Sequence, residues 1–67
     1  MANGVVLQVL EAISEGAGTV REIEWALPAA NRAKVYRALG ELLDAEWIDK
    51  DGDRYFLGIK AQRLWAR

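Results

Sequence analysis

The feature that most constrains the fold of this chain is residues 33–58, where a helical pattern passes directly into a hairpin pattern. In its first half, Val35, Leu39 and Leu42 recur at the spacing of one helix face. In its second half, two short runs rich in aromatic and apolar residues flank an Asp-Gly-Asp sequence that is typical of a tight turn. An amphipathic helix followed at once by a two-stranded ribbon indicates a mostly α fold with a small β-hairpin.

Two shorter helical patterns precede this segment. The first is expected over residues 4–15, where one face carries Val6, Val9, Leu10 and Ile13. The second starts at Thr19, because Thr19 and Glu22 have the spacing of a capping box. It stops near Leu27, because the following Pro28 cannot continue a helix.

The remaining elements follow from caps and turn signals. Asn31 is a good N-cap residue and is expected to open a third helix over residues 31–45. The hairpin strands are expected at 46–50 and 54–58, with a loop of two or three residues, and a short helix is expected at 59–67. The sequence therefore predicts a three-helix core, a two-stranded ribbon and a short C-terminal helix.

Composition excludes several classes of protein. The 67 residues are enough for one domain, 1–67, and 52% of them are hydrophobic. The chain has no Cys for a disulfide or thiolate metal site, and no His to act as a metal ligand or general base. Ser14 therefore has no base partner, and neither a metal, a cofactor nor an enzyme activity is expected.

No targeting or membrane-spanning segment is recognised. No apolar run approaches the roughly 20 residues that a transmembrane helix needs. The N-terminus lacks a basic region followed by an apolar core, so it does not read as a secretory signal. We therefore expect a cytoplasmic protein with no membrane partner.

The chain resembles the N-terminal DNA-binding domain of the IclR-type transcriptional regulators, a winged helix-turn-helix family, and shares generic features with the MarR-like regulators. The resemblance covers residues 5–65. The matching runs are 9–13, 19–23, 27–28, 35–39 with Leu42, 47–48 and 54–58. The most specific of them is the closing Arg-Tyr-Phe-Leu-Gly at 54–58, which a helix follows.

The chain departs from this family in four respects. Ala33 and Lys34 stand where the family often has a Ser-Thr pair, and the turn between the second and third helices is longer. Glu46 stands where the family has Gly just after the third helix. The large C-terminal effector domain of the family has no counterpart here, so ligand sensing is not carried over, and a fragment of a larger regulator stays an open alternative.

The resemblance implies sequence-specific binding of double-stranded DNA, with the helix over 31–45 in the major groove and its N-terminal residues at the base edges. The candidate contacts on this helix are Asn31, Arg32, Lys34 and Arg37. Arg can bridge guanine and Asn can bridge adenine, whereas Lys contacts phosphate equally well. The alternative is that these are solvated charges and that Asn31 is only a cap.

The hairpin gives a mixed signal for DNA binding. Lys50 and Arg54 flank its tip and are candidate phosphate contacts. The two Asp residues of the turn would repel phosphates. A purely structural hairpin, which packs Trp47 and Tyr55 over the core, is an equally good interpretation.

Apolar residues outside the core stripes are candidates for an interface. Val5 and Leu7, together with Leu64 and Trp65, form a second apolar patch that fits a homodimer, with packing inside the monomer as the alternative. Trp25 lies off the inward stripe of its helix and is either a partner contact or a lid on the hairpin.

An alternative function is a winged-helix protein-interaction module that does not bind DNA. The net charge of −1, the acidic hairpin tip and the three Trp residues all favour it, because dedicated DNA-binding domains are usually basic. Salt-dependent DNA binding would separate the two functions.

Overall fold

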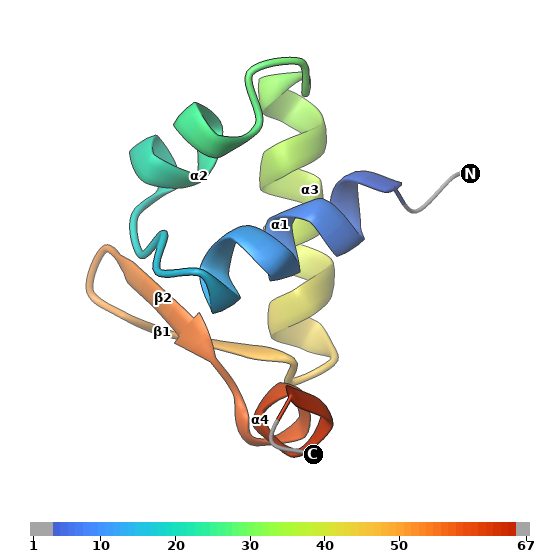
Figure 1. Ribbon diagram of the computed structural model, residues 1–67, viewed down its shortest axis with the longest axis vertical. Helices are drawn as coiled ribbons and strands as arrows, with labels where there is room; N and C mark the ends of the chain where they lie inside the picture. Colours follow the sequence, from blue (N-terminus) through green and yellow to red (C-terminus); the bar gives the residue numbers. More distant parts are fainter. Residues whose placement is uncertain (1–3, 66–67) are drawn as a thin grey trace.

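The computed structural model describes residues 4–65, the side chains of residues 64 and 65 excepted. Its elements, in chain order, are α1 (Gly4–Ser14), α2 (Val20–Ala26), α3 (Arg32–Asp44), β1 (Ile48–Asp51), β2 (Arg54–Leu57) and α4 (Ile59–Trp65). Helix α1 crosses α3, α2 lies beside the N-terminal end of α3, and the hairpin and α4 lie toward its C-terminal end (Figure 1). The fold is mostly helical with one antiparallel two-stranded sheet, as predicted.

A glycine ends α1 where the sequence predicted it. Gly16 has φ 115°, a left-handed conformation that side chains disfavour. Its N–H donates to the carbonyl of Ile13 at 3.1 Å, and the N–H of Ala17 donates to the carbonyl of Ala12 at 3.0 Å. This pair of bonds is a Schellman motif, which satisfies carbonyls at the helix end.

The predicted capping box opens α2. The N–H of Glu22 donates to Thr19 Oγ1 at 3.2 Å, and the N–H of Thr19 donates to Glu22 Oε1 at 3.1 Å. The N–H of Gly18 also donates to Glu22 Oε1, at 2.7 Å. These backbone hydrogen bonds, the one from Gly18 first, lower the pKa of the Glu22 carboxyl, and the charge of Arg54 acts in the same direction.

The junction between α2 and α3 is a short turn that includes Pro28. The N–H of Ala30 donates to the carbonyl of Leu27 at 3.0 Å, and Pro28 supplies the fixed φ that suits its position in such a turn. Asn31 then caps α3, because its Oδ1 accepts the N–H of Ala33 at 2.7 Å. Both helix boundaries agree with the sequence prediction to within about a residue.

The prediction that β1 begins at residue 46 is wrong. Glu46 and Trp47 instead complete the C-terminal end of α3, in a second Schellman motif. The N–H of Glu46 donates to Leu43 at 3.0 Å, and the N–H of Trp47 donates to Leu42 at 2.9 Å. Glu46 has φ 65°, so a glutamate holds the left-handed position that Gly16 holds in α1.

The hairpin has a two-residue turn, Gly52 and Asp53, with Asp51 paired to Arg54. Gly52 has φ 66°, as the first central residue of such a turn requires. The outer edge of β2 is held by the α1–α2 connection, because the N–H of Tyr55 donates to the carbonyl of Gly18. The hairpin is thus fixed to the body of the molecule along β2.

One hydrophobic core joins helices and hairpin. Its buried members are Val9, Leu10, Ile13, Ile23, Val35, Ala38, Leu39, Leu42, Ile48, Tyr55 and Ala61. All three predicted helix stripes contribute, although Val6, Val20 and Leu27 are only partly buried. No polar or charged side chain is buried within the described part of the chain, and no described helix has the length and apolar character to cross a membrane.

Candidate nucleic-acid interface

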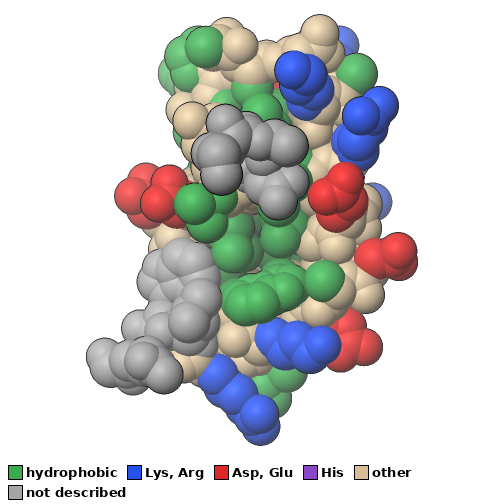
Figure 2. Space-filling view, turned by 90° about the vertical axis from the view of Figure 1, so that its right-hand side faces the viewer, with side chains coloured by type: hydrophobic (Ala, Val, Ile, Leu, Met, Phe, Trp, Pro, Cys, Tyr) green, Lys and Arg blue, Asp and Glu red, His purple; other side chains and the backbone are tan. Residues whose placement is uncertain are grey.

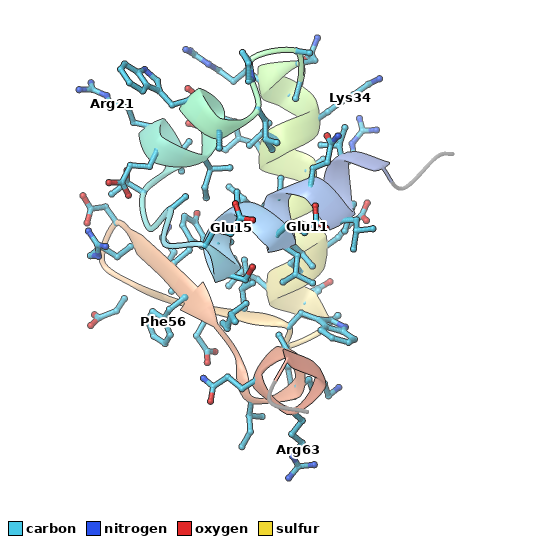
Figure 3. The ribbon with its side chains drawn as sticks, in the orientation of Figure 1. Glu11, Glu15, Arg21, Lys34, Phe56 and Arg63 are labelled. Carbon is cyan, nitrogen blue, oxygen red and sulfur yellow. The ribbon has the colours of Figure 1, made fainter. Side chains whose placement is uncertain are left out.

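The first half of α3 carries exposed basic side chains. Arg32, Lys34 and Arg37 are all exposed, whereas the exposed acidic residues Glu41 and Asp44 lie in the second half. Figure 2 shows Lys and Arg gathered toward the upper right of one face, with Asp and Glu below them along the same edge. Lys34 points away from the body of the molecule (Figure 3). The helix therefore presents a positive end and a negative end.

This charge order opposes the helix dipole. The N-terminus of a helix is the positive end of its dipole, so acidic residues there and basic residues at the C-terminus are stabilising. Helix α3 has no acidic residue in its first turn and no basic residue in its last turn. Lys34 occupies the N3 position, where α2 has the capping-box residue Glu22. The arrangement adds fixed positive charge to a helix end that already favours anions.

Asn31 caps α3, as predicted. Its Oδ1 accepts the Ala33 N–H at 2.7 Å. Bidentate pairing with adenine needs both the oxygen and the nitrogen of an Asn amide. The capping bond uses only Oδ1, so the Nδ2 hydrogens of Asn31 can still donate to another acceptor.

Arg32 is held toward α2. Its Nε lies 3.2 Å from Glu24 Oε2, while its side chain remains 77% exposed. Lys34 and Arg37 are three residues apart and therefore neighbours on the helix surface, whereas Arg32 lies on the flank nearer α2. The predicted basic set on α3 is thus an adjacent pair, Lys34 and Arg37, and one arginine anchored across the α2–α3 turn.

The two basic residues of the hairpin do not share a face. Side chains alternate along a strand, so the register places Lys50 with Tyr55 on one face and Arg54 with Asp51 on the other. Lys50 Nζ lies 5.5 Å from the centre of the Tyr55 ring. The Arg54 guanidinium lies against Gly18, where a Cβ would meet its Cζ at 2.9 Å.

The outer face of the hairpin is acidic. Asp49 and Asp51 are exposed there beside Phe56, and Asp53 is exposed at the tip. Phe56 projects outward (Figure 3). On the inner face Ile48 and Tyr55 are buried in the core, so the hairpin has the structural role that one interpretation assigned to it.

The predicted interface residues differ in exposure. Val5 packs against the core and is half-buried, whereas Leu7 is 56% exposed. Trp25 is 85% exposed, so its interpretation as a lid on the hairpin is wrong. The side chains of Leu64 and Trp65 lie outside the described residues.

Two residues near this surface were missed by the sequence interpretation. Glu24 was given no role, yet it anchors Arg32. Tyr36, which borders the core face of α3, was likewise given no role, and it is 53% exposed. The helical spacing of Tyr36 was a signal for a border position, but nothing local links Glu24 to Arg32, because the turn between α2 and α3 brings them together.

Among the described residues, no group of three or more acidic side chains is arranged to hold a metal ion. In comparisons with protein-family models, curated proteins and solved structures, no match to this chain is found. The functional inference therefore depends on the residues of the chain and their arrangement.

Proposed function

We propose that this chain is a winged helix-turn-helix domain that binds double-stranded DNA and regulates transcription, with α3 as its recognition helix. One observation carries the proposal: Arg32, Lys34 and Arg37 are exposed on the first half of α3, in an order that opposes the helix dipole. Folding alone does not favour this order, whereas binding of phosphate and base edges does.

The proposed mode of binding places α3 in the major groove. The N-terminal residues of a recognition helix meet the base edges there. Arg37 is the best candidate for a guanine contact, because its guanidinium can bond O6 and N7 together. Lys34 is assigned to phosphate, and the small residues Ala33 and Gly40 on the same outer face allow close approach.

The hairpin has a smaller part in this proposal. Its acidic outer face would repel phosphates, so contact is limited to Lys50 and to Arg54, whose guanidinium already lies against Gly18. A homodimer would place two copies of α3 about 34 Å apart, in successive major grooves. In the predicted patch of Val5, Leu7, Leu64 and Trp65, Leu7 on α1 is the described side chain that is exposed, and it is assigned to that dimer contact.

The test is fluorescence anisotropy of a labelled random-sequence duplex at about 50 and about 200 mM salt. Neutralisation of several phosphates predicts that affinity falls about tenfold or more at the higher salt. Arg37→Ala is expected to weaken binding about tenfold. Arg63→Ala, on the exposed side of α4, is the matched control and should bind as the parent chain does.

A second candidate function is a winged-helix interaction module that does not bind DNA. The exposed acidic residues of the hairpin, Asp49 and Asp51 on its outer face and Asp53 at its tip, are the observation that favours it. Absence of binding at about 50 mM salt, where electrostatic affinity is highest, would contradict the DNA proposal and leave this function in its place.

A further inference from the structure

Trp25 is the most exposed large hydrophobic residue among those described. Its relative exposure is 85%, against 63% for Ile59, the next highest. It projects from the side of α2 opposite the buried Ile23. Tryptophan and arginine are the residues most enriched at the energetic centres of protein interfaces. An indole this exposed is therefore a candidate contact for a partner.

The charges beside Trp25 define what kind of partner fits. Arg21 lies one turn earlier on the same face of α2, since residues four apart are neighbours on a helix surface. Two ion pairs occur among the described residues, Arg32 with Glu24 and Lys60 with Glu46, and Arg21 is in neither. Arg21 therefore offers a guanidinium that no described carboxylate neutralises.

The acidic residues of α2 are already engaged. Glu22 accepts the N–H groups of Gly18 and Thr19, and Glu24 is paired with Arg32. Besides Glu22 and Ala26, the exposed residues of α2 are one large aromatic ring and one cation that is in no described ion pair. We call Arg21 and Trp25 the α2 surface.

We propose that the α2 surface is a docking site for a protein segment that presents a carboxylate next to a large apolar side chain. The carboxylate would pair with Arg21 in a bidentate contact, and the apolar side chain would cover the indole of Trp25. This function is additional to DNA binding and does not depend on it. Arg21 and Lys34 point to opposite sides of the molecule (Figure 3), so both surfaces are accessible together.

Two other occupants fit the charges less well. A second copy of the chain, related by a two-fold axis through Trp25, would bring two Arg21 guanidinium groups close together. Duplex DNA carries a dense row of phosphates and is bound by clusters of basic residues. The α2 surface has one such residue, with Glu22 and Glu24 nearby.

The test is an NMR titration of the ¹⁵N-labelled full chain, in which the indole N–H of Trp25 is assigned by comparison with Trp25→Phe. The probes are a short blocked peptide in which Glu alternates with Leu and Phe, the same peptide with Lys for Glu, and a random-sequence duplex. We expect the Glu peptide to shift the Trp25 indole signal and the Lys peptide not to shift it.

Variants place the binding on the α2 surface. Trp25→Ala and Arg21→Glu are expected to weaken binding of the Glu peptide about tenfold or more, as measured from the backbone amide signals, because Trp25→Ala has no indole. Phe56→Ala, an exposed aromatic on the hairpin, and Arg63→Glu, an exposed cation on α4, are matched controls that should leave the affinity unchanged. Arg37→Ala should also leave it unchanged, which separates this site from α3.

Several results would overturn the proposal. They are equal binding of the two peptides, no binding of the Glu peptide, or an equal loss in the Phe56→Ala control. A shift of the Trp25 indole by the duplex alone would instead assign the α2 surface to DNA. Dependence of the α2 backbone amide signals on protein concentration, abolished in Trp25→Ala, would assign the α2 surface to a second copy.

Discussion

At the scale of single residues, the two Schellman motifs show what this sequence tolerates. Gly16 and Glu46 hold equivalent positions after α1 and α3, with φ 115° and 65°. Glycine adopts such angles freely, whereas a residue with a Cβ is strained there by about 1–2 kcal/mol. The Glu46 side chain offers little in return, because its contact with Lys60 Nζ is exposed and 4.0 Å long.

We therefore predict that Glu46→Gly stabilises the fold. The relief of strain exceeds the added entropy of glycine in the unfolded chain, and we expect a net gain of about 1 kcal/mol. Urea unfolding followed by circular dichroism measures this as a higher midpoint. Glu46→Ala is the control, since it removes the carboxylate but keeps the Cβ, and it should gain nothing. A lower midpoint for Glu46→Gly would show that no strain is stored at this position.

At the scale of elements, α2 and α3 differ in how their first turns are built. Both have a side-chain cap, Thr19 in one and Asn31 in the other. The N3 residue is Glu22 in α2 and Lys34 in α3, so only α2 completes a capping box and complements its dipole. The N-terminal end of α3, which carries the proposed DNA contacts, is therefore less stabilised by local interactions than the N-terminal end of α2.

A prediction for α3 is that Lys34→Glu raises stability and lowers DNA affinity in the same protein. The new carboxylate can accept the N–H of Asn31 and interacts favourably with the dipole, for a gain of about 0.5–1 kcal/mol. Thermal unfolding and duplex anisotropy measure the two effects. Lys34→Gln should fall between the parent chain and Lys34→Glu both in thermal stability and in affinity for the duplex. A loss of stability in Lys34→Glu would refute the dipole interpretation.

A prediction for α2 concerns the loss of folding stability at acidic pH. The pKa of Glu22 is lowered from its ordinary value of 4.5 by the N–H groups that it accepts. A lowered folded-state pKa contributes stability that is present above the unfolded value and is lost as pH falls through the folded value. Glu22→Gln keeps an acceptor for the cap without titrating. Its unfolding midpoint should fall less than that of the parent between neutral pH and about pH 3. Equal pH dependence in the two proteins would contradict this.

At the scale of the whole molecule, hairpin and helices are joined at two backbone contacts. The carbonyl of Gly18 receives the N–H of Tyr55, and the N–H of Gly58 donates to the carbonyl of Trp47 at 2.8 Å. The second contact extends the hairpin by one pair, to Trp47, the last residue of the Schellman motif that ends α3. A Cβ on Gly58 would lie 2.6 Å from the carbonyl oxygen of Glu46 and 3.1 Å from the carbonyl carbon of Trp47. Glycine at position 58 is required by this close approach.

Gly58→Ala is expected to destabilise the whole fold by about 1–3 kcal/mol, because backbone and not a flexible side chain must move. Gly40→Ala is the matched control: nothing lies within 4 Å of its Cβ position in α3. That control should gain about 0.5–1 kcal/mol, since Ala favours the helix. Denaturant midpoints measure both. If Gly58→Ala proved neutral, the packing of α3 against the hairpin would be looser than described.

The sequence by itself determined the order of the elements, the caps Thr19 and Asn31, the turn at Gly52 and most of the core. These features depend on interactions within a few residues or on the period of a helix or strand, and both can be read along the chain. The same logic misplaced the start of β1, because a glutamate at position 46 carries no local sign of a left-handed conformation.

Only the tertiary structure decided which charged side chains have a partner and which side chains remain exposed to solvent. The Arg32–Glu24 pair spans the α2–α3 turn, and Arg54 reaches Gly18 because the hairpin lies along the α1–α2 connection. The exposure of Trp25 likewise depends on the packing of the elements, because no described element covers the outer side of α2. The physical reason is the same in each case: charge pairing and burial depend on distances through space, and these are set when the elements pack together.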